Sequence, residues 1–121
     1  MHWVLPYTNL KASNVFSTLA ALRLCAKGRP KRFAFVSSTS VLDTEHFVNQ
    51  SEAGTPVSET DDLEGSRQGL GTGYGQSKWV SEQLVREAGR RGLKGSIIRS
   101  GYVMGDPATG SKYLILRSQN S

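Results

Sequence analysis

The chain has 121 residues, of which 37% are hydrophobic and 21% are charged, and its mean hydropathy is −0.37. This size allows one small domain at most, and the composition argues against a disordered chain. No apolar run approaches the roughly 18–20 residues that a membrane-spanning helix needs, and residues 1–6 lack the features of a signal peptide. The single cysteine, Cys25, excludes an internal disulfide framework and a cysteine-based zinc site. We therefore expect a cytoplasmic protein with no membrane partner and no metal.

The net charge is +5, from 15 lysines and arginines against 10 acidic residues. The basic residues gather near predicted helix ends, at 27–32 and 86–94, where cations complement the helix dipole. They are not interleaved with aromatic residues, as they are on surfaces that bind single-stranded nucleic acid. We therefore expect no nucleic-acid partner.

A helix is predicted over residues 10–27, because apolar residues recur on one face at helical spacing. These residues are Val15, Leu19, Leu22 and Ala26. Gly28 and Pro30 follow and would end the helix. Residues 33–36 (FAFV) are a short apolar run without alternation, which is typical of a strand buried in a parallel sheet. The run ends in a hydroxyl cluster at residues 37–40 (SSTS).

Residues 43–73 are a long polar stretch, and a connection of this length is usually functional. A second helix is predicted over residues 74–91, a second buried strand at 96–98, and a loop at 101–107. The alternation of helices and strands predicts an α/β fold with a partial, Rossmann-like, doubly wound parallel sheet. Two strands are too few for such a sheet, so we expect the middle segment of a larger domain.

Two groups of polar residues are expected at the carboxyl ends of these strands, where ligands bind in open α/β sheets. One is the hydroxyl cluster at 37–40, and the other is Tyr74 with Lys78 at the start of the second helix. Tyr74 and Lys78 are four residues apart and therefore share a helix face. A nearby ammonium group lowers the pKa of a tyrosine. This combination could donate a proton to a carbonyl oxygen that receives a hydride at carbon.

These residues resemble those of the extended short-chain dehydrogenase/reductase family. Several longer sequence segments resemble, more specifically, the carboxyl-terminal thioester reductase domain of the fungal aminoadipate reductases. The resemblance covers roughly residues 1–110, and its most specific segments are residues 35–46 (FVSSTSVLDTEH), 59–67 (ETDDLEGSR), 69–79 (GLGTGYGQSKW) and 87–92 (EAGRRG).

The resemblance implies that Tyr74 is the catalytic acid, that Lys78 assists it and binds the nicotinamide ribose, and that Ser38, or else Thr39, is the hydroxyl partner. Gly101, Tyr102 and Val103 match the loop beside the nicotinamide. The implied reaction is the NADPH-dependent release of an aminoadipyl thioester as the semialdehyde, in lysine biosynthesis. The substrate would be carried on the phosphopantetheine arm of a carrier domain. Asn14 matches a residue behind the site, in either a local structural contact or a relay role.

The sequence departs from the family in several places. It has no glycine-rich fingerprint for a pyrophosphate and no residue that would distinguish NADP from NAD. We therefore expect the isolated chain to bind the cofactor weakly and to be inactive. Ser100 occupies a position where the family usually has proline, and residues 111–121 no longer resemble the family's sequence pattern. The expected organisation is a partial reductase domain at 1–110 and a divergent tail at 111–121. The alternatives are another extended short-chain reductase or epimerase, and a non-catalytic truncated remnant.

Overall fold

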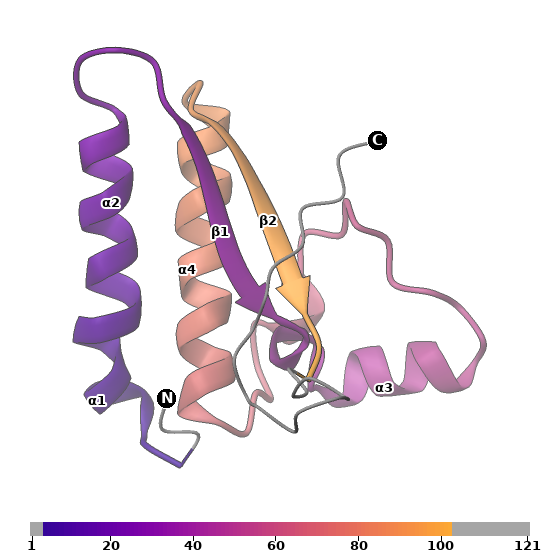
Figure 1. The fold of residues 1–121 in the computed structure, drawn as a ribbon. Coiled ribbons are helices and arrows are strands. Elements are labelled where there is room, and N and C mark those ends of the chain that lie inside the picture. Colours follow the sequence, from indigo (N-terminus) through magenta and orange to yellow (C-terminus); the bar gives the residue numbers. More distant parts are fainter. Residues whose placement is uncertain (1–3, 103–121) are drawn as a thin grey trace, which may run out of the picture.

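The computed structural model describes residues 4–102, which form two long helices, two strands and a lobe built from the connection between them (Figure 1). Helices and strands alternate along the chain, and both strands belong to one sheet. No helix among residues 4–102 is long and apolar enough to cross a membrane.

The first helical segment has three consecutive parts. Helix α1 spans Tyr7–Leu10, a π-helical segment spans Lys11–Phe16, and helix α2 spans Ser17–Cys25. The prediction over residues 10–27 located this segment but not its π-helical part. Beyond the helix, Gly28 has a φ of +71°, a backbone conformation that glycine adopts without strain.

Strands β1 (Arg32–Ser38) and β2 (Lys94–Ser100) are parallel neighbours, each longer than predicted. Their register pairs Phe35 with Ile97 and Ser38 with Ser100. The carboxyl ends of both strands therefore meet at the same edge of the sheet. This pairing confirms the predicted α/β fold with a parallel sheet.

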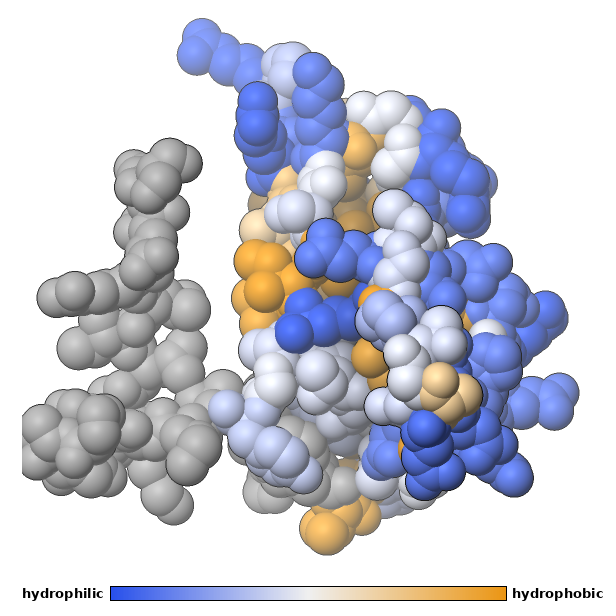
Figure 2. Space-filling view, turned by 90° about the vertical axis from the view of Figure 1, so that its right-hand side faces the viewer, coloured by the Kyte–Doolittle hydropathy of each residue, from blue (hydrophilic) through white to orange (hydrophobic). Residues whose placement is uncertain are grey.

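Helices α2 and α4 (Gly73–Arg90) pack against one face of the sheet (Figure 1). Leu22 of α2, Phe35 of β1 and Val85 of α4 form the buried centre of this core. On the opposite face, Val36 and Ile98 are each 53% exposed. In the side view, hydrophobic residues come to the surface in a band bordered by hydrophilic ones (Figure 2). Alternate residues of each strand thus have very different surroundings.

The polar stretch between β1 and α4 contains an element that the sequence analysis missed. Helix α3 spans Glu45–Glu52, and Phe47 from this helix joins Val41 and Leu63 in a second buried cluster. Trp79 of α4 packs against this cluster and donates its indole N–H to the Leu63 carbonyl at 2.9 Å. The long connection is therefore a small lobe with a core of its own, fastened to α4.

Candidate active site

The hydroxyl cluster lies where β1 ends. Ser38 is the last residue of β1 and is only 6% exposed. Its Oγ accepts a hydrogen bond from the Ser40 backbone N–H at 3.2 Å and donates one to Ser40 Oγ at 3.0 Å. Ser38 thereby caps the short 3-10 helix over Thr39–Leu42 that follows the strand. This local hydrogen bonding fixes the Ser38 hydroxyl at the strand end.

The start of α4 is built to approach this turn closely. Thr72 caps the helix by accepting the Gly75 N–H at 3.0 Å. A Cβ atom added at Gly75 would lie 2.9 Å from the Ser40 carbonyl oxygen, closer than real Cβ contacts allow. The glycine therefore lets the first turn of α4, with Tyr74, pack directly against the hydroxyl cluster.

Tyr74 and Lys78 occupy adjacent turns of α4. Tyr74 is 4% exposed, and the Lys78 Nζ lies 5.7 Å from the centre of its ring. The same Nζ lies 5.0 Å from the Phe35 ring centre and donates a hydrogen bond to the Val36 carbonyl at 2.9 Å. The predicted proximity of Lys78 to Tyr74 is thus present, and the ammonium group also reaches the sheet two residues before Ser38.

Burial lowers the pKa of Lys78 from its ordinary value of 10.5, and the negative charge of Glu82 acts in the opposite direction. Glu82 lies one turn further along α4 and has no exposed surface. The ammonium group of Lys78 therefore sits between a desolvating environment and a compensating carboxylate, a combination typical of functional lysines.

A cavity of about 280 Å³ opens at the carboxyl ends of the two strands. Its lining residues come from the turn after β1 and the loop after β2, and are Ser38, Thr39, Ser40, Leu42, Asp43, Gly101 and Tyr102. The structure therefore brings together Ser38 and two of the three predicted loop residues. Val103 lies outside the described residues. Within residues 4–102, no group of three or more histidine, cysteine, aspartate or glutamate residues could hold a metal ion.

Asn14 connects the first helical segment to the helix that carries Tyr74. Its side-chain amide donates to Ser77 Oγ at 2.9 Å, and its backbone carbonyl accepts hydrogen bonds from the Thr18 and Ser81 hydroxyls. Ser77 in turn donates to the Tyr74 carbonyl at 2.8 Å. Asn14 lies in the π-helical segment, and such segments are frequent at functional sites. Its observed contacts are structural ones that support the Tyr74 turn from behind.

Sequence reasoning missed the buried ion pair between Glu82 of α4 and Arg99 of β2. Glutamate in a helix is usually exposed to solvent, so the residue type alone does not single out Glu82. One signal was available, because Glu82 follows Tyr74 and Lys78 at successive intervals of four residues and therefore lies on the same face.

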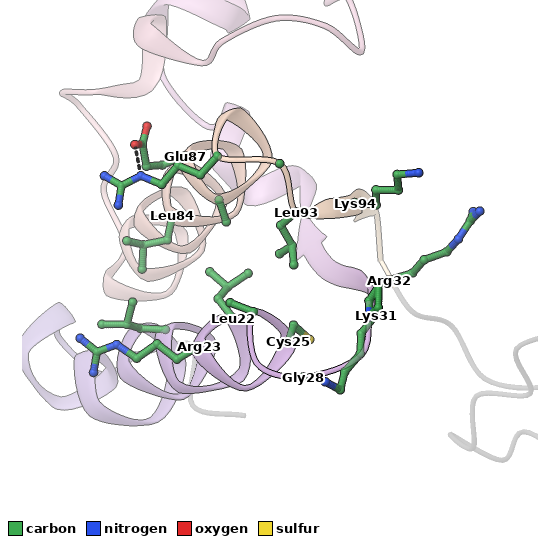
Figure 3. A pocket seen from close by; sticks show the side chains of 16 residues that line it. Leu22, Arg23, Cys25, Gly28, Lys31, Arg32, Leu84, Glu87, Leu93 and Lys94 are labelled. Carbon is green, nitrogen blue, oxygen red and sulfur yellow. Dashed lines mark hydrogen bonds and ion pairs between the residues drawn. The ribbon is translucent and has the colours of Figure 1, made fainter.

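A second and larger cavity, of about 950 Å³, lies at the opposite end of the sheet, between α2 and α4 (Figure 3). Leu22, Leu84 and Leu93 point into it, and charged residues such as Arg23, Arg32 and Lys94 surround it. It lies near the amino ends of both strands. It therefore shares no lining residue with the candidate active site.

Comparison with known proteins identifies relatives of similar sequence. The chain is 60% identical over 116 residues to the L-2-aminoadipate reductase large subunit of Penicillium chrysogenum and 53% identical over 116 residues to the L-2-aminoadipate reductase of Saccharomyces cerevisiae. Each alignment covers 92% of this chain and 8% of the relative. The chain thus spans a small part of these relatives.

Two solved structures resemble the fold. The terminal R domain of the myxalamid PKS-NRPS biosynthetic pathway is 41% identical, with a TM-score of 0.74 over 87% of this chain and 25% of that one. A thiolation-reductase di-domain of an archaeal non-ribosomal peptide synthetase is 28% identical, with a TM-score of 0.59 over 76% of this chain and 19% of that one. These similarities confirm a Rossmann-like fold of the extended short-chain dehydrogenase/reductase type. A family model matches residues 1–115, and the chain therefore belongs to the NAD-binding family described as "Male sterility protein".

Proposed function

We propose that this chain carries the proton-donating part of a nicotinamide-dependent thioester reductase. Tyr74 would be the acid, Lys78 its electrostatic partner and Ser38 the hydroxyl that orients the substrate oxygen. The observation that carries the proposal is the position of the Lys78 ammonium group. It lies 5.7 Å from the Tyr74 ring centre, on the helix whose first turn packs against the strand-end hydroxyl cluster.

The chemistry follows from the charges of these groups. An ordinary phenol is a weak acid at neutral pH. A positive charge nearby stabilises the phenolate that remains after the proton leaves, and Lys78 would supply that charge during proton transfer. We predict that the Ser38 and Tyr74 hydroxyls share the carbonyl oxygen of the substrate. Ser38 suits this role better than Thr39 because it is buried and fixed by two hydrogen bonds, whereas Thr39 is exposed.

The described residues fit part of the nicotinamide end of a cofactor: Gly101 and Tyr102 line the 280 Å³ cavity, whereas Tyr74 and Lys78 are not among its lining residues. The 280 Å³ cavity lies at the carboxyl ends of parallel strands, the usual ligand position in this class of sheet. A Cβ atom at Gly101 would meet open space, so the loop leaves room there. Tyr74, Lys78, Gly101, Tyr102 and Val103 would hold the nicotinamide and its ribose. When bound, NADPH would supply hydride to the thioester carbonyl carbon.

The substrate class is inferred from the relatives. Two of them are named L-2-aminoadipate reductase, and the structural neighbours are a terminal R domain and a thiolation-reductase di-domain. We infer an aminoadipyl thioester carried by the phosphopantetheine arm of a thiolation domain. Transfer of a hydride to carbon and of the Tyr74 proton to oxygen would form a hemithioacetal. Cleavage of its C–S bond, with the hydroxyl proton passing to sulfur, would release the semialdehyde and the free thiol. This reaction would serve lysine biosynthesis.

The test uses a whole enzyme. In the Penicillium chrysogenum relative, the 116 aligned residues are replaced by those of this chain. Tyr74→Phe should then lower turnover by roughly 10²–10⁴-fold, because it removes the proton donor. Loading of aminoadipate onto the carrier domain should persist, since it uses other domains. The measurement is NADPH oxidation in single turnover, alongside radiolabel on the carrier.

Tyr7→Phe is the matched control, because it makes the same chemical change, loss of a phenolic hydroxyl, at a tyrosine of helix α1. Its turnover should equal that of the parent. Unchanged turnover in Tyr74→Phe would refute the assigned role. Loss of loading together with reduction would instead reveal a folding defect, which circular dichroism would detect.

A further inference from the structure

The buried pair formed by Glu82 and Arg99 links the helix of the candidate site to the second strand. Arg99 Nε lies 3.0 Å from Glu82 Oε1, and Arg99 Nη2 lies 2.9 Å from Glu82 Oε2. The Glu82 side chain is fully buried, and that of Arg99 is 15% exposed. Two parallel hydrogen bonds of this kind fix both distance and orientation, unlike a contact through a single donor.

Both partners occupy positions from which they could control the site. Glu82 follows Lys78 by one turn of α4. Arg99 is the penultimate residue of β2 and pairs in register with Ser37. The residues that follow β2 are Gly101 and Tyr102, which line the 280 Å³ cavity together with Ser38. The pair therefore joins the catalytic helix to the strand from which the cavity loop departs.

We infer that Glu82 and Arg99 are positioning residues: their ion pair holds the end of β2, and with it the Gly101–Tyr102 loop, in place against the helix that carries Tyr74 and Lys78. The pair does not line the cavity itself. It acts through the elements that do. This inference extends the proposed function, because it assigns the residues that set the distance between the proton donor and the cofactor loop.

A second effect accompanies the positioning. The negative charge of Glu82 opposes the lowering of the pKa of Lys78 by burial. Arg99 from β2 neutralises part of that carboxylate charge. From α4, Tyr74 also faces Lys78, while β1 presents the uncharged Phe35 ring and the Val36 carbonyl. Removing either partner should therefore move the pKa of Lys78, and in opposite directions.

The experiment uses the 121-residue chain without cofactor, so its outcome is independent of whether the proposed reaction occurs. The variants are Glu82→Gln and Arg99→Gln, with Glu87→Gln as a matched control. Glu87 also lies on α4 and is also paired with arginines, but its side chain is 42% exposed. Two quantities are measured by NMR: the titration of the Lys78 side chain, assigned through Lys78→Arg, and the backbone order parameters of Ser100 and Gly101.

We expect Glu82→Gln to lower the pKa of Lys78 further, because it removes a negative charge, and Arg99→Gln to raise it, because it removes a positive one. Both variants should lower the order parameters of Ser100 and Gly101. Glu87→Gln should change neither quantity. A purely structural pair would shift Lys78 in the same direction in both variants, toward its unfolded value. Shifts in one direction, or unchanged order parameters, would therefore overturn the inference.

A buried charge left without its partner can unfold a protein. If either single variant does not fold, Arg99→Lys decides the question. Lysine keeps the positive charge but cannot form the two parallel hydrogen bonds. The order parameters of Ser100 and Gly101 should then fall while the Lys78 titration stays close to that of the parent. Unchanged order parameters in Arg99→Lys would overturn the inference.

Discussion

At the scale of single residues, the half-buried lysine of the candidate site is held at a cost to folding. Burial lowers the pKa of Lys78 below 10.5, and Glu82 only partly opposes this effect. The ammonium form is therefore better solvated in the unfolded chain than in the folded one. A residue that costs stability where a neutral one would not is typical of a site shaped by function.

This imbalance makes stability depend on pH. Between the folded-state pKa of Lys78 and 10.5, the unfolded chain binds the proton more strongly, so stability rises with pH in this window. Below the window both states are protonated and the full cost applies. Compared with Lys78→Met, which has no titrating group there, the parent should gain stability as pH rises. Urea unfolding of both proteins from about pH 8 to about pH 11 measures this difference. A constant difference would contradict the prediction.

Gly75 is required for packing, because the first turn of α4 approaches the backbone at Ser40 too closely for a larger residue. An added Cβ would meet the Ser40 carbonyl oxygen at 2.9 Å and Thr72 Oγ1 at 3.1 Å. We expect Gly75→Ala to destabilise the chain by about 1–3 kcal/mol, the usual cost of overpacking. Gly89→Ala on the same helix is the control, since nothing lies within 4 Å of its added Cβ.

Gly89→Ala should stabilise the chain by up to about 1 kcal/mol through helix propensity. Thermal unfolding followed by circular dichroism measures both variants. Equal effects at the two positions would show that α4 does not press against the hydroxyl cluster at Gly75.

At the scale of elements, the lobe between β1 and α4 depends on one aromatic residue. Phe47 of α3 is buried with Val41 and Leu63, and Trp79 of α4 covers the cluster. We expect Phe47→Ala to cost about 3–5 kcal/mol, because it empties the centre of a small core. The neighbouring Val48 is 46% exposed, so Val48→Ala should stay within about 0.5 kcal/mol of the parent. Chemical denaturation measures the free energy of unfolding of both variants. Similar losses of stability would contradict the prediction that Phe47 is central to the core of the lobe.

The sequence predicted the elements that carry a strong periodic or apolar signal. Helix α4 was expected at 74–91 and spans Gly73–Arg90, and both strands were located with ends a few residues short. Helix α3 was missed because its eight residues bury only Phe47, which is too little for a repeating pattern. Thr44 before Glu45 is a helix-start signal that could have been used.

The site was predictable in part for the same reason. Tyr74 and Lys78 share a face through helical geometry alone, and Ser38 follows from the end of an apolar strand. The pair of Glu82 with Arg99 joins two elements, so its partners can be identified only once the packing of α4 on β2 is known. Leu63 is buried with a φ of +62°. No sequence rule assigns this conformation to leucine, although the Asp61 side chain supports it by accepting the Leu63 N–H at 2.7 Å.

At the scale of the whole molecule, positive charge is concentrated at the end of the sheet where the strands begin. Residues 23–32 and 87–94 contain eight of the 15 lysines and arginines and only one of the 10 acidic residues. Both segments surround the large cavity at the amino ends of the strands (Figure 3). Among the described residues, Arg23, Lys27, Arg29, Arg32 and Lys94 form no ion pair. Like charges therefore face one another at this end of the molecule.

Mutual repulsion at this end should make stability depend on salt. The Debye length falls from about 30 Å at 0.01 M to about 10 Å at 0.1 M, so sodium chloride screens these charges. We expect the melting temperature to rise across this range. Lys27→Gln with Arg29→Gln should raise the melting temperature at low salt and reduce the increment, because it removes two of the repelling charges. Arg67→Gln is the control, since Arg67 lies outside the basic segments and pairs with Glu64. A salt increment equal in all three proteins would show that the basic end is not under electrostatic strain.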